Sequence, residues 1–308
     1  MTPGAHRSMR LPLATTSQED APVFIAGLAH SGKTELRRAL SCLPHLELTR
    51  RTYVWTRFYD RFGDLGDDAN LSRCLGVLAE DEDAARLEPD IERIEREFLS
   101  GPRTYTRLFA IFHRQHAERR GKTRWGDQLG SVEHLARRIL TALPEARMIH
   151  MIRDPRSLFA PRGGSTSSAE RIGLNTARWV ASASAGQTNM QTFPERYLIL
   201  RHEDLWSRTP DVLQQVCQFL EEPYSPDMVV KLSGNRRGGD DEESMIRRPA
   251  FEIVFTELHA AEHLAALRYP VSGIQMSRSE RLAYRLSQQP RGRAAMKLWR
   301  ATQTRRYR

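Results

Sequence analysis

VFIAGLAHSGKT, residues 23–34, decides the fold of this 308-residue chain. Its first four residues form an apolar run typical of a buried strand, and its last eight fit the pattern G-x-x-x-x-G-K-[ST] in full. From Thr34 onward, apolar residues recur at helical spacing until Pro44. Glycines between a strand and a helix let backbone N–H groups turn inward around a phosphate, and the helix N-terminus adds partial positive charge. The motif in this setting predicts a phosphate-binding loop over residues 27–34.

The polar residues of this loop are the first candidate ligand contacts. Lys33 is expected to neutralise phosphate oxygens, and the Thr34 hydroxyl to donate to one of them or to hold a metal ion. Only four lysines occur among many arginines, so a lysine at this position is not background composition. The predicted contact set is Gly27, His30, Ser31, Gly32, Lys33 and Thr34. The alternative is a glycine-containing turn that binds nothing.

Strands and helices alternate along the rest of the chain. Residues 147–152 (RMIHMI) and 197–201 (YLILR) read as strands, and helices are predicted near 132–143, 173–190 and 210–220. Such alternation predicts a parallel sheet with helices on both faces. We therefore expect an α/β fold, a three-layer α/β/α arrangement of the P-loop nucleotide-binding type.

Composition and segment boundaries suggest an ordinary globular protein. We expect a disordered N-terminus over 1–20, one α/β domain over 21–275 and a basic, helical C-terminal tail over 276–308. No apolar run of about 18 residues occurs, and the N-terminus lacks the apolar stretch of a signal peptide. The three cysteines are scattered, which favours reduced thiols and a cytoplasmic location.

The net charge of +9 lies entirely in the tail. Residues 278–308 hold ten basic side chains and one acidic one, so the rest of the chain is neutral and is not a basic nucleic-acid-binding domain. Basic residues interleaved with apolar ones at helical spacing suit an anionic membrane surface, which would place the protein at the membrane periphery. The alternative is a helix packed on the domain with its arginines solvated. Nucleic acid is a weaker option, because no base-reading motif accompanies the charge.

Three blocks of sequence together resemble the P-loop sulfotransferases of bacteria. APVFIAGLAHSGKTELRRAL (21–40) resembles their 5′-phosphosulfate loop. RWGDQLGSVEHLARRILTALPEARMIHMIRDPRS (124–157) resembles a second block, in which a WG-[DE] element precedes a helix and a strand ending in RDPR. RYLILRHEDLWSRTPDVLQQVCQFL (196–220) resembles a third, a strand followed by a helix. Order and spacing match over about residues 21–270, and RDPR is the most specific element.

The resemblance implies a sulfotransferase that uses 3′-phosphoadenosine-5′-phosphosulfate (PAPS) and releases PAP. The acceptor would be a hydroxyl or amine of a small molecule, sugar or lipid. The loop would hold the 5′-phosphosulfate, and Arg153 the 3′-phosphate. Arg153 directly follows the strand 147–152, at the carboxyl end where ligands collect in open parallel sheets, and its guanidinium is a fork of donors suited to phosphate. The alternative is that Arg153 pairs with Asp154.

Several positions depart from the family pattern, among them Leu129 and Gly130, which stand where the family has Thr-Pro. His30 stands where the family has Arg or Lys, and Lys33 where it has Thr, as if one cation had moved along the loop. Gln128 replaces a lysine, and Pro161 replaces a serine that follows the arginine. Three polar residues can take over the contact of that serine: Ser157, Arg162 and Ser165. A degenerate, non-catalytic nucleotide-binding or membrane-peripheral protein is therefore a second alternative.

The candidate catalytic groups are Lys33, His30 and Asp127. Lys33 and His30 are cations near the bridging oxygen, since nearby negative charge raises the pKa of a histidine. Asp127, in the matched WGD block, is the first candidate for a general base that takes the acceptor proton, and Glu47 the second. His30 can instead be a polar loop residue, and Asp127 a loop cap. The aromatic residues between 53 and 59 either line an acceptor pocket or belong to the core.

A small-molecule kinase is the main rival enzyme, because residues 27–34 fit the ATP-type loop better than the loop of the sulfotransferases. It would need Mg²⁺ and a carboxylate at a second strand end, and Asp154 follows Arg153 rather than ending a strand. No metal site is expected otherwise. His259 and His263 share a helix face without a third ligand.

Overall fold

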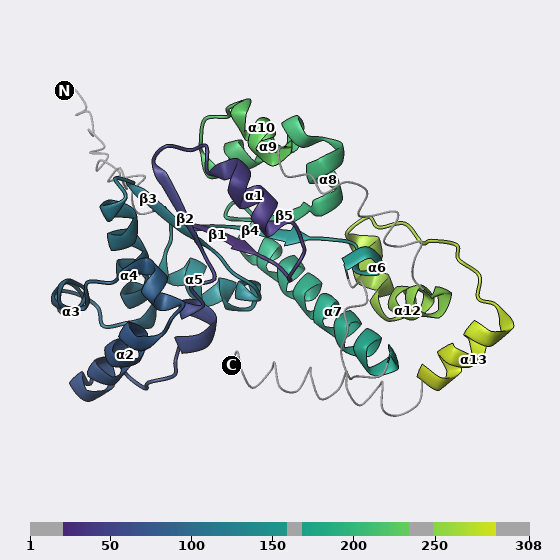
Figure 1. Cartoon of the computed structure of the whole chain (residues 1–308), viewed down its shortest axis with the longest axis horizontal. Helices are drawn as coiled ribbons and strands as arrows, with labels where there is room; N and C mark the ends of the chain where they lie inside the picture. Colours follow the sequence, from purple (N-terminus) through teal and green to yellow (C-terminus); the bar gives the residue numbers. More distant parts are fainter. Residues whose placement is uncertain (1–20, 159–167, 234–248, 288–308) are drawn as a thin grey trace, which may run out of the picture.

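A computed structural model of the chain describes residues 21–158, 168–233 and 249–287. Its centre is a sheet of five parallel strands in the order β2-β3-β1-β4-β5 (Figure 1). The strands are β1 (Val23–Ala26), β2 (Leu46–Arg50), β3 (Arg124–Gln128), β4 (Arg147–Ile152) and β5 (Tyr197–Arg201). The chain leaves β1 toward one edge of the sheet and later returns to its other side. The carboxyl end of β1 is therefore a topological switch point, where open α/β sheets bind ligands.

One face of the sheet is covered by a group of helices close to the phosphate loop. They are α1 (Lys33–Leu40), α8 (His202–Ser207), α9 (Thr209–Leu220) and α10 (Asp227–Ser233). Helix α1 buries Leu36, Ala39 and Leu40, which follow helical spacing, in the same apolar cluster as Ile25 and Val216. This apolar stripe explains why the loop is followed by a helix that lies along the sheet.

Helices from the middle of the chain cover the other face (Figure 1). They are α2 (Asp68–Glu80), α3 (Ile91–Leu99), α4 (Tyr105–Arg119), α5 (Ala136–Ala142) and α7 (Ser168–Thr192), with short turns η2 (Val54–Phe58), η3 (Ala84–Leu87) and η4 (Val132–Leu135). Phe24 of β1 packs edge-to-face on Trp55 and Trp125, with ring centroids 5.3 and 5.7 Å away. Aromatic residues thus form the centre of this core.

The C-terminal helices lie beyond α7, at the right in Figure 1. They are α12 (Ala250–Ala266) and α13 (Arg278–Ser287), and α12 packs on α7 and on the short α6 (Pro155–Leu158). Glu280 holds α13 in place, because its carboxylate accepts from the backbone N–H of Ala250 at 3.0 Å and from that of Ser277 at 2.9 Å. Among the helices described, none is long and apolar enough to cross a membrane.

The predicted three-layer α/β/α fold is confirmed, as are the strands β1, β4 and β5. Strands β2 and β3 were not predicted from the sequence. Both contain charged residues, so neither reads as an apolar run. The helix expected from residue 132 begins as the turn η4, because Ser131 adopts φ 64° and makes no side-chain cap. Residues 1–20 and 288–308 lie outside the described part, and the three-segment division stays a prediction.

A buried ion pair fixes the amino-terminal edge of the sheet. Arg124, the first residue of β3, contacts Glu222 beyond α9 and donates to the carbonyls of Ala21 at 2.6 Å and Leu220 at 3.0 Å. The two side chains are 1% and 0% exposed. Because an unpaired buried charge is costly, the pair keeps Arg124, Ala21 and residues 220–222 in fixed positions relative to one another.

Glu222→Ala should therefore destabilise the fold strongly, by about 3–5 kcal/mol, because it leaves the Arg124 guanidinium buried without its counter-charge. The control is Glu118→Ala, which removes a half-exposed partner of Arg93 and should cost about 1 kcal/mol or less. Urea unfolding of both variants measures the difference. Equal losses would contradict the role given to Glu222.

Candidate functional site

The phosphate loop packs tightly on the neighbouring strand β4. Gly27 adopts φ 121°, and a Cβ added to it would lie 2.1 Å from the carbonyl oxygen of Met151. Gly32 adopts φ 96°, and its Cβ would lie 2.7 Å from the ring of His202. Both positions require glycine. His30 lies at the exposed tip of the loop with φ 66°.

Lys33 turns back into the loop. Its Nζ donates to the carbonyl oxygens of Gly27 and Leu28, both at 2.5 Å, and the residue is 8% exposed. Burial lowers the pKa of Lys33 to about 8, although the nearby carboxylates of Glu133 and Glu35 raise it. The ammonium group can reach a ligand by exchanging these loop carbonyls for ligand oxygens.

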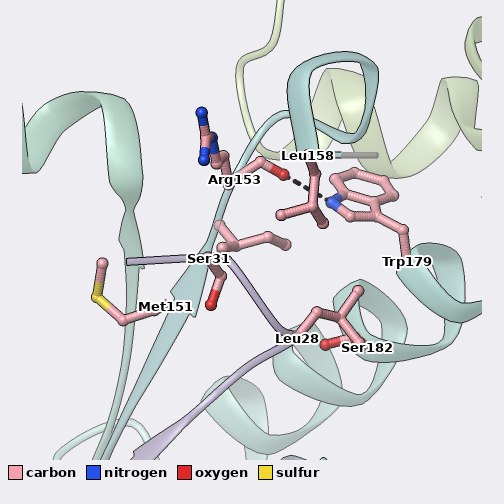
Figure 2. A pocket seen from close by; sticks show the side chains of 8 residues that line it. Leu28, Ser31, Met151, Arg153, Leu158, Trp179 and Ser182 are labelled. Atoms are coloured by element: carbon pink, nitrogen blue, oxygen red, sulfur yellow. Dashed lines mark hydrogen bonds between the residues drawn. The ribbon is translucent and has the colours of Figure 1, made fainter. Parts of the chain in front are cut away.

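Arg153 lies beside the loop at the end of β4. Its Nη1 donates to the carbonyl oxygen of His30 at 3.2 Å, and its own carbonyl accepts from Trp179 Nε1 at 2.8 Å. Figure 2 shows Arg153 and Trp179 beside a shallow hollow, with the hydrogen bond between them drawn as a dashed line. The hollow is lined by Leu28, Ser31, Met151, Ile152, Arg153, Leu158, Trp179 and Ser182. The structure thus brings the loop and Arg153 together, as the sequence predicts.

Ser31 presents a buried hydroxyl at this hollow. The residue is 1% exposed, and its Oγ has no hydrogen-bond partner among the residues the structure describes. A buried polar group normally finds a partner, because leaving it unsatisfied costs free energy. The Ser31 hydroxyl is therefore suited to a ligand that brings an oxygen into the loop.

The turn after Arg153 is anchored from two sides, a feature that sequence reasoning missed. The carboxylate of Asp154 accepts from Arg156 Nε at 2.9 Å and Nη2 at 2.6 Å, while Arg156 Nη1 reaches Glu257 Oε1 at 2.5 Å and the Pro270 carbonyl at 2.7 Å. The N–H of Asp154 donates to Glu203 at 2.8 Å. Arg156 is buried, so this network holds the position of Arg153. Glu257 and Pro270 lie 101 and 114 residues from Arg156 in sequence, and no local signal reveals them.

The other predicted phosphate contacts differ in their placement. Ser157 Oγ donates to the carbonyl oxygen of Asp154 at 3.1 Å and is buried in α6. Arg162 and Ser165 lie outside the described residues. The Thr34 hydroxyl accepts from Gln128 Nε2 at 3.4 Å, so the residue that replaces the family lysine contacts the loop.

Asp127 lies on the opposite face of the sheet from α1. Successive strand residues point to opposite faces, so Gln128 reaches Thr34 while Asp127 points toward α4. The carboxylate is fully buried and accepts from Thr49 Oγ1 at 2.8 Å and Thr52 Oγ1 at 2.6 Å. Burial raises its pKa to about 7 against these donors. The carboxyl group is therefore shielded from solvent in this structure, and its role as a base stays a prediction.

His113 lies 3.4 Å from Asp127, yet the pair is not an ion pair. Trp55 Nε1 donates to His113 Nε2 at 3.2 Å, which leaves the proton on Nδ1, facing Thr49 Oγ1 at 3.2 Å. Burial lowers the pKa of His113 to about 3, so the ring is neutral. A chain of donors therefore runs from Trp55 to the Asp127 carboxyl.

The remaining candidates are placed as follows. Trp55 and Phe58 are buried in the core, as one of the two alternatives expected, and Tyr53 and Tyr59 are partly buried against it. Glu47 is half-buried on the edge strand β2, 3.9 Å from His116. Within the described residues, no group of three metal-ligating side chains gathers at one place.

Comparison with known proteins gives one clear family. The model of a sulfotransferase family matches residues 22–226, two thirds of the chain. The sulfotransferase domain from the curacin biosynthetic pathway is 15% identical with a TM-score of 0.50, covering 82% of this chain and 98% of that one. Sulfotransferase STF9 from Mycobacterium avium is 12% identical, also with a TM-score of 0.50, covering 82% and 78%. The sulfotransferase domain of the Synechococcus PCC 7002 olefin synthase is 20% identical with a TM-score of 0.49, covering 81% and 95%. No curated protein matches the sequence significantly.

The buried carboxyl of Asp127 leads to a prediction about stability and pH. Its pKa is about 7 in the folded chain and 3.8 ordinarily, so the folded state binds more protons between these values. Stability should therefore fall as the pH rises through this window, with at most about 1.4 kcal/mol per pH unit from this group. The free energy of unfolding, measured with urea at pH 5 and pH 7, should decrease less between these two values in Asp127→Asn than in the wild type. Identical losses would mean that Asp127 is already ionised at pH 5.

Proposed function

Because this chain belongs to the sulfotransferase family and transfers a sulfuryl group, we propose that its donor is PAPS and its product PAP. The observation that supports this most is the pairing of two cationic elements at the carboxyl edge of the sheet. Lys33 belongs to the phosphate loop, and Arg153 is hydrogen-bonded to that loop through the carbonyl of His30. Two separated cations suit a nucleotide with phosphates at both its 5′ and 3′ positions.

The loop fits the phosphosulfate end of such a donor. Gly27 and Gly32 let the loop backbone pack closely on its neighbours. Among the described residues, the buried Ser31 hydroxyl makes no hydrogen bond, so it is able to form one with a ligand. When bound, PAPS supplies the activated sulfuryl group. Ser31 and Lys33 would hold its oxygens, with Lys33 leaving the carbonyls of Gly27 and Leu28.

The cations act at different stages of the reaction. Lys33, as the cation of the loop, would stabilise the negative charge that grows on the leaving phosphate during transfer. His30, at the exposed loop tip, can be protonated beside the donor and assist. Arg153 binds the remote 3′-phosphate, with Ser157, Arg162 and Ser165 as proposed helpers. The base that receives the acceptor proton stays open, because Asp127 is enclosed.

We propose that the acceptor is a small molecule, sugar or lipid with a hydroxyl or amine. The basic tail remains a proposed membrane contact. Its described part, α13, exposes Arg281, Leu282 and Arg285, a mixture of charge and apolar surface that supports this idea.

The first test compares the binding of PAP with that of ATP–Mg²⁺ and AMP. PAP should raise the melting temperature most, because it alone presents a 3′-phosphate to Arg153; saturation at a hundredfold excess over Kd adds about 2.7 kcal/mol. The kinase alternative needs a carboxylate for Mg²⁺, and that of Asp154 is held by Arg156. Stabilisation by ATP–Mg²⁺ but not by PAP would favour the kinase.

The second test separates catalysis from binding. Lys33→Ala should lower kcat by roughly 10²–10³-fold, the usual effect of removing a group that stabilises transition-state charge. Arg153→Ala should instead raise the KM for PAPS by roughly 10–100-fold, since a hydrogen bond to a charged group contributes about 1.5–3 kcal/mol. Lys231→Ala, on the exposed side of α10, is the control and should change neither. An unchanged KM in Arg153→Ala would refute its assignment to the 3′-phosphate.

A further inference from the structure

A buried carboxylate lies directly behind the phosphate loop. Glu133, in the turn η4, is 1% exposed, and its Oε2 accepts from the backbone N–H of Gly27 at 3.2 Å. Its Oε1 accepts from Ser182 Oγ of α7 at 2.6 Å. Asn189 of α7 donates to its backbone carbonyl at 2.8 Å. The first residue of the loop is thus tied to a side chain 106 positions away.

Behind Ser182, a chain of donors points toward this carboxylate. Because Ser182 donates to Glu133, its oxygen accepts from His150 Nε2, 3.0 Å away, and His150 Nδ1 then accepts from the Tyr197 hydroxyl at 3.0 Å. A Cβ on Gly186 of α7 would lie 2.5 Å from His150 Nδ1, so the helix has room for this ring only at a glycine. Hydrogen bonds aligned in one direction strengthen one another in a buried site.

This arrangement keeps Glu133 ionised. Burial alone would raise the pKa of Glu133, but positive charge on the neighbouring imidazoles at low pH and the Ser182 donor outweigh burial, and the pKa lies below its ordinary value. At neutral pH, where His150 is uncharged, the hydrogen bonds from Ser182 and from the Gly27 amide stabilise the carboxylate. A negative charge behind an anion-binding loop opposes anion binding, so its presence needs a reason. The reason lies in Lys33. Burial lowers the pKa of Lys33 and so favours its neutral amine, and the negative charge of Glu133 counteracts this effect by raising that pKa.

We propose that Glu133 is a positioning residue for sulfuryl transfer: its carboxylate holds the Gly27 amide in place and acts as the buried counter-charge of the Lys33 ammonium. The loop then meets the donor in its final shape and with a charged lysine. The proposal rests on the donor role of residues 27–34 given above, and it adds a residue from outside the loop to that site.

The titratable groups around Lys33 come from four elements. Glu35 lies on α1 with Lys33 and also raises its pKa. Glu133 of η4 and Lys33 both contact Gly27, and the carboxylate raises the pKa of the lysine. His150 of β4 interacts electrostatically with Lys33, and His202 packs on the adjacent Gly32 at the start of α8. Burial lowers the pKa of His150 to about 4, so this ring carries no charge at neutral pH. Glu133 is therefore the buried carboxylate that dominates the charge balance of Lys33.

The direct experiment is an NMR titration of Lys33 in the donor-free protein. The chain has only four lysines, so ¹³Cε-lysine labelling gives few signals, and Lys33→Arg assigns the one of interest. In the wild type, Lys33 should titrate near pH 8. In Glu133→Gln, which keeps an oxygen to accept from Gly27 but removes the charge, the titration should move down by about one pH unit or more. An unchanged midpoint would overturn the proposal.

Two further variants separate the charge from the contact and from the fold. Tyr197→Phe removes the far end of the donor chain but leaves the carboxylate, so Lys33 should still titrate near its wild-type midpoint. Glu133→Asp keeps the charge but shortens the reach to Gly27. Its Lys33 midpoint should stay closer to the wild type than that of Glu133→Gln, while its affinity for PAP falls several-fold. If Glu133→Gln fails to fold, Glu133→Asp still tests the proposal, because a PAP affinity equal to that of the wild type would contradict the positioning role of Glu133.

Binding of PAP to the wild type tests the proposed use of PAPS separately from the proposed role of Glu133. PAP affinity should fall with rising pH as Lys33 loses its proton, and in Glu133→Gln this fall should occur at lower pH, together with the Lys33 midpoint. If Glu133 had only a structural role, its substitution would lower PAP affinity equally at every pH. If the Lys33 midpoint shifts but the wild type binds no PAP, the proposed donor is wrong and the counter-charge stands. If PAP binds and the midpoint does not shift, the donor stands and the role of Glu133 is overturned.

Discussion

The site depends on the close approach of the phosphate loop to strand β4. Gly27 lies so near the Met151 carbonyl that a Cβ would fall within 2.1 Å of it, and only glycine allows this contact. The approach places the loop next to the residue that ends β4, so that Arg153 reaches the His30 carbonyl. Two positive groups from chain segments more than a hundred residues apart thus share one edge of the sheet.

Buried charges hold this geometry, and each has partners. Arg156 joins Asp154 to Glu257, while Glu133 joins the loop to α7 and raises the pKa of Lys33. Such pairs add little net stability compared with apolar packing, but removing one partner is costly. They therefore fix position more than they add stability. In this protein the positions that they fix are those of the loop and of the turn that carries Arg153.

The sequence predicts the parts of the site that rest on local patterns. The loop, its strand and helix, and the strand before Arg153 follow from glycine spacing and apolar runs. Partners brought together by the fold could not be predicted: Glu133 and Gly27 are 106 residues apart, and Arg156 and Glu257 are 101 apart. Asp127 shows the same limit, because its enclosure by Thr49 depends on the pairing of β2 with β3, two strands without a clear apolar pattern.

A crystal structure of the chain with PAP bound tests the central claim most directly. We predict the 5′-phosphate inside the loop 27–34, in contact with Ser31 Oγ, and the 3′-phosphate on Arg153. Lys33 Nζ should have left the carbonyl oxygens of Gly27 and Leu28 for the phosphate, while Glu133 keeps its contact with the Gly27 amide. A complex with the phosphates elsewhere, or with Lys33 still on the loop carbonyls, would contradict this reading of the site.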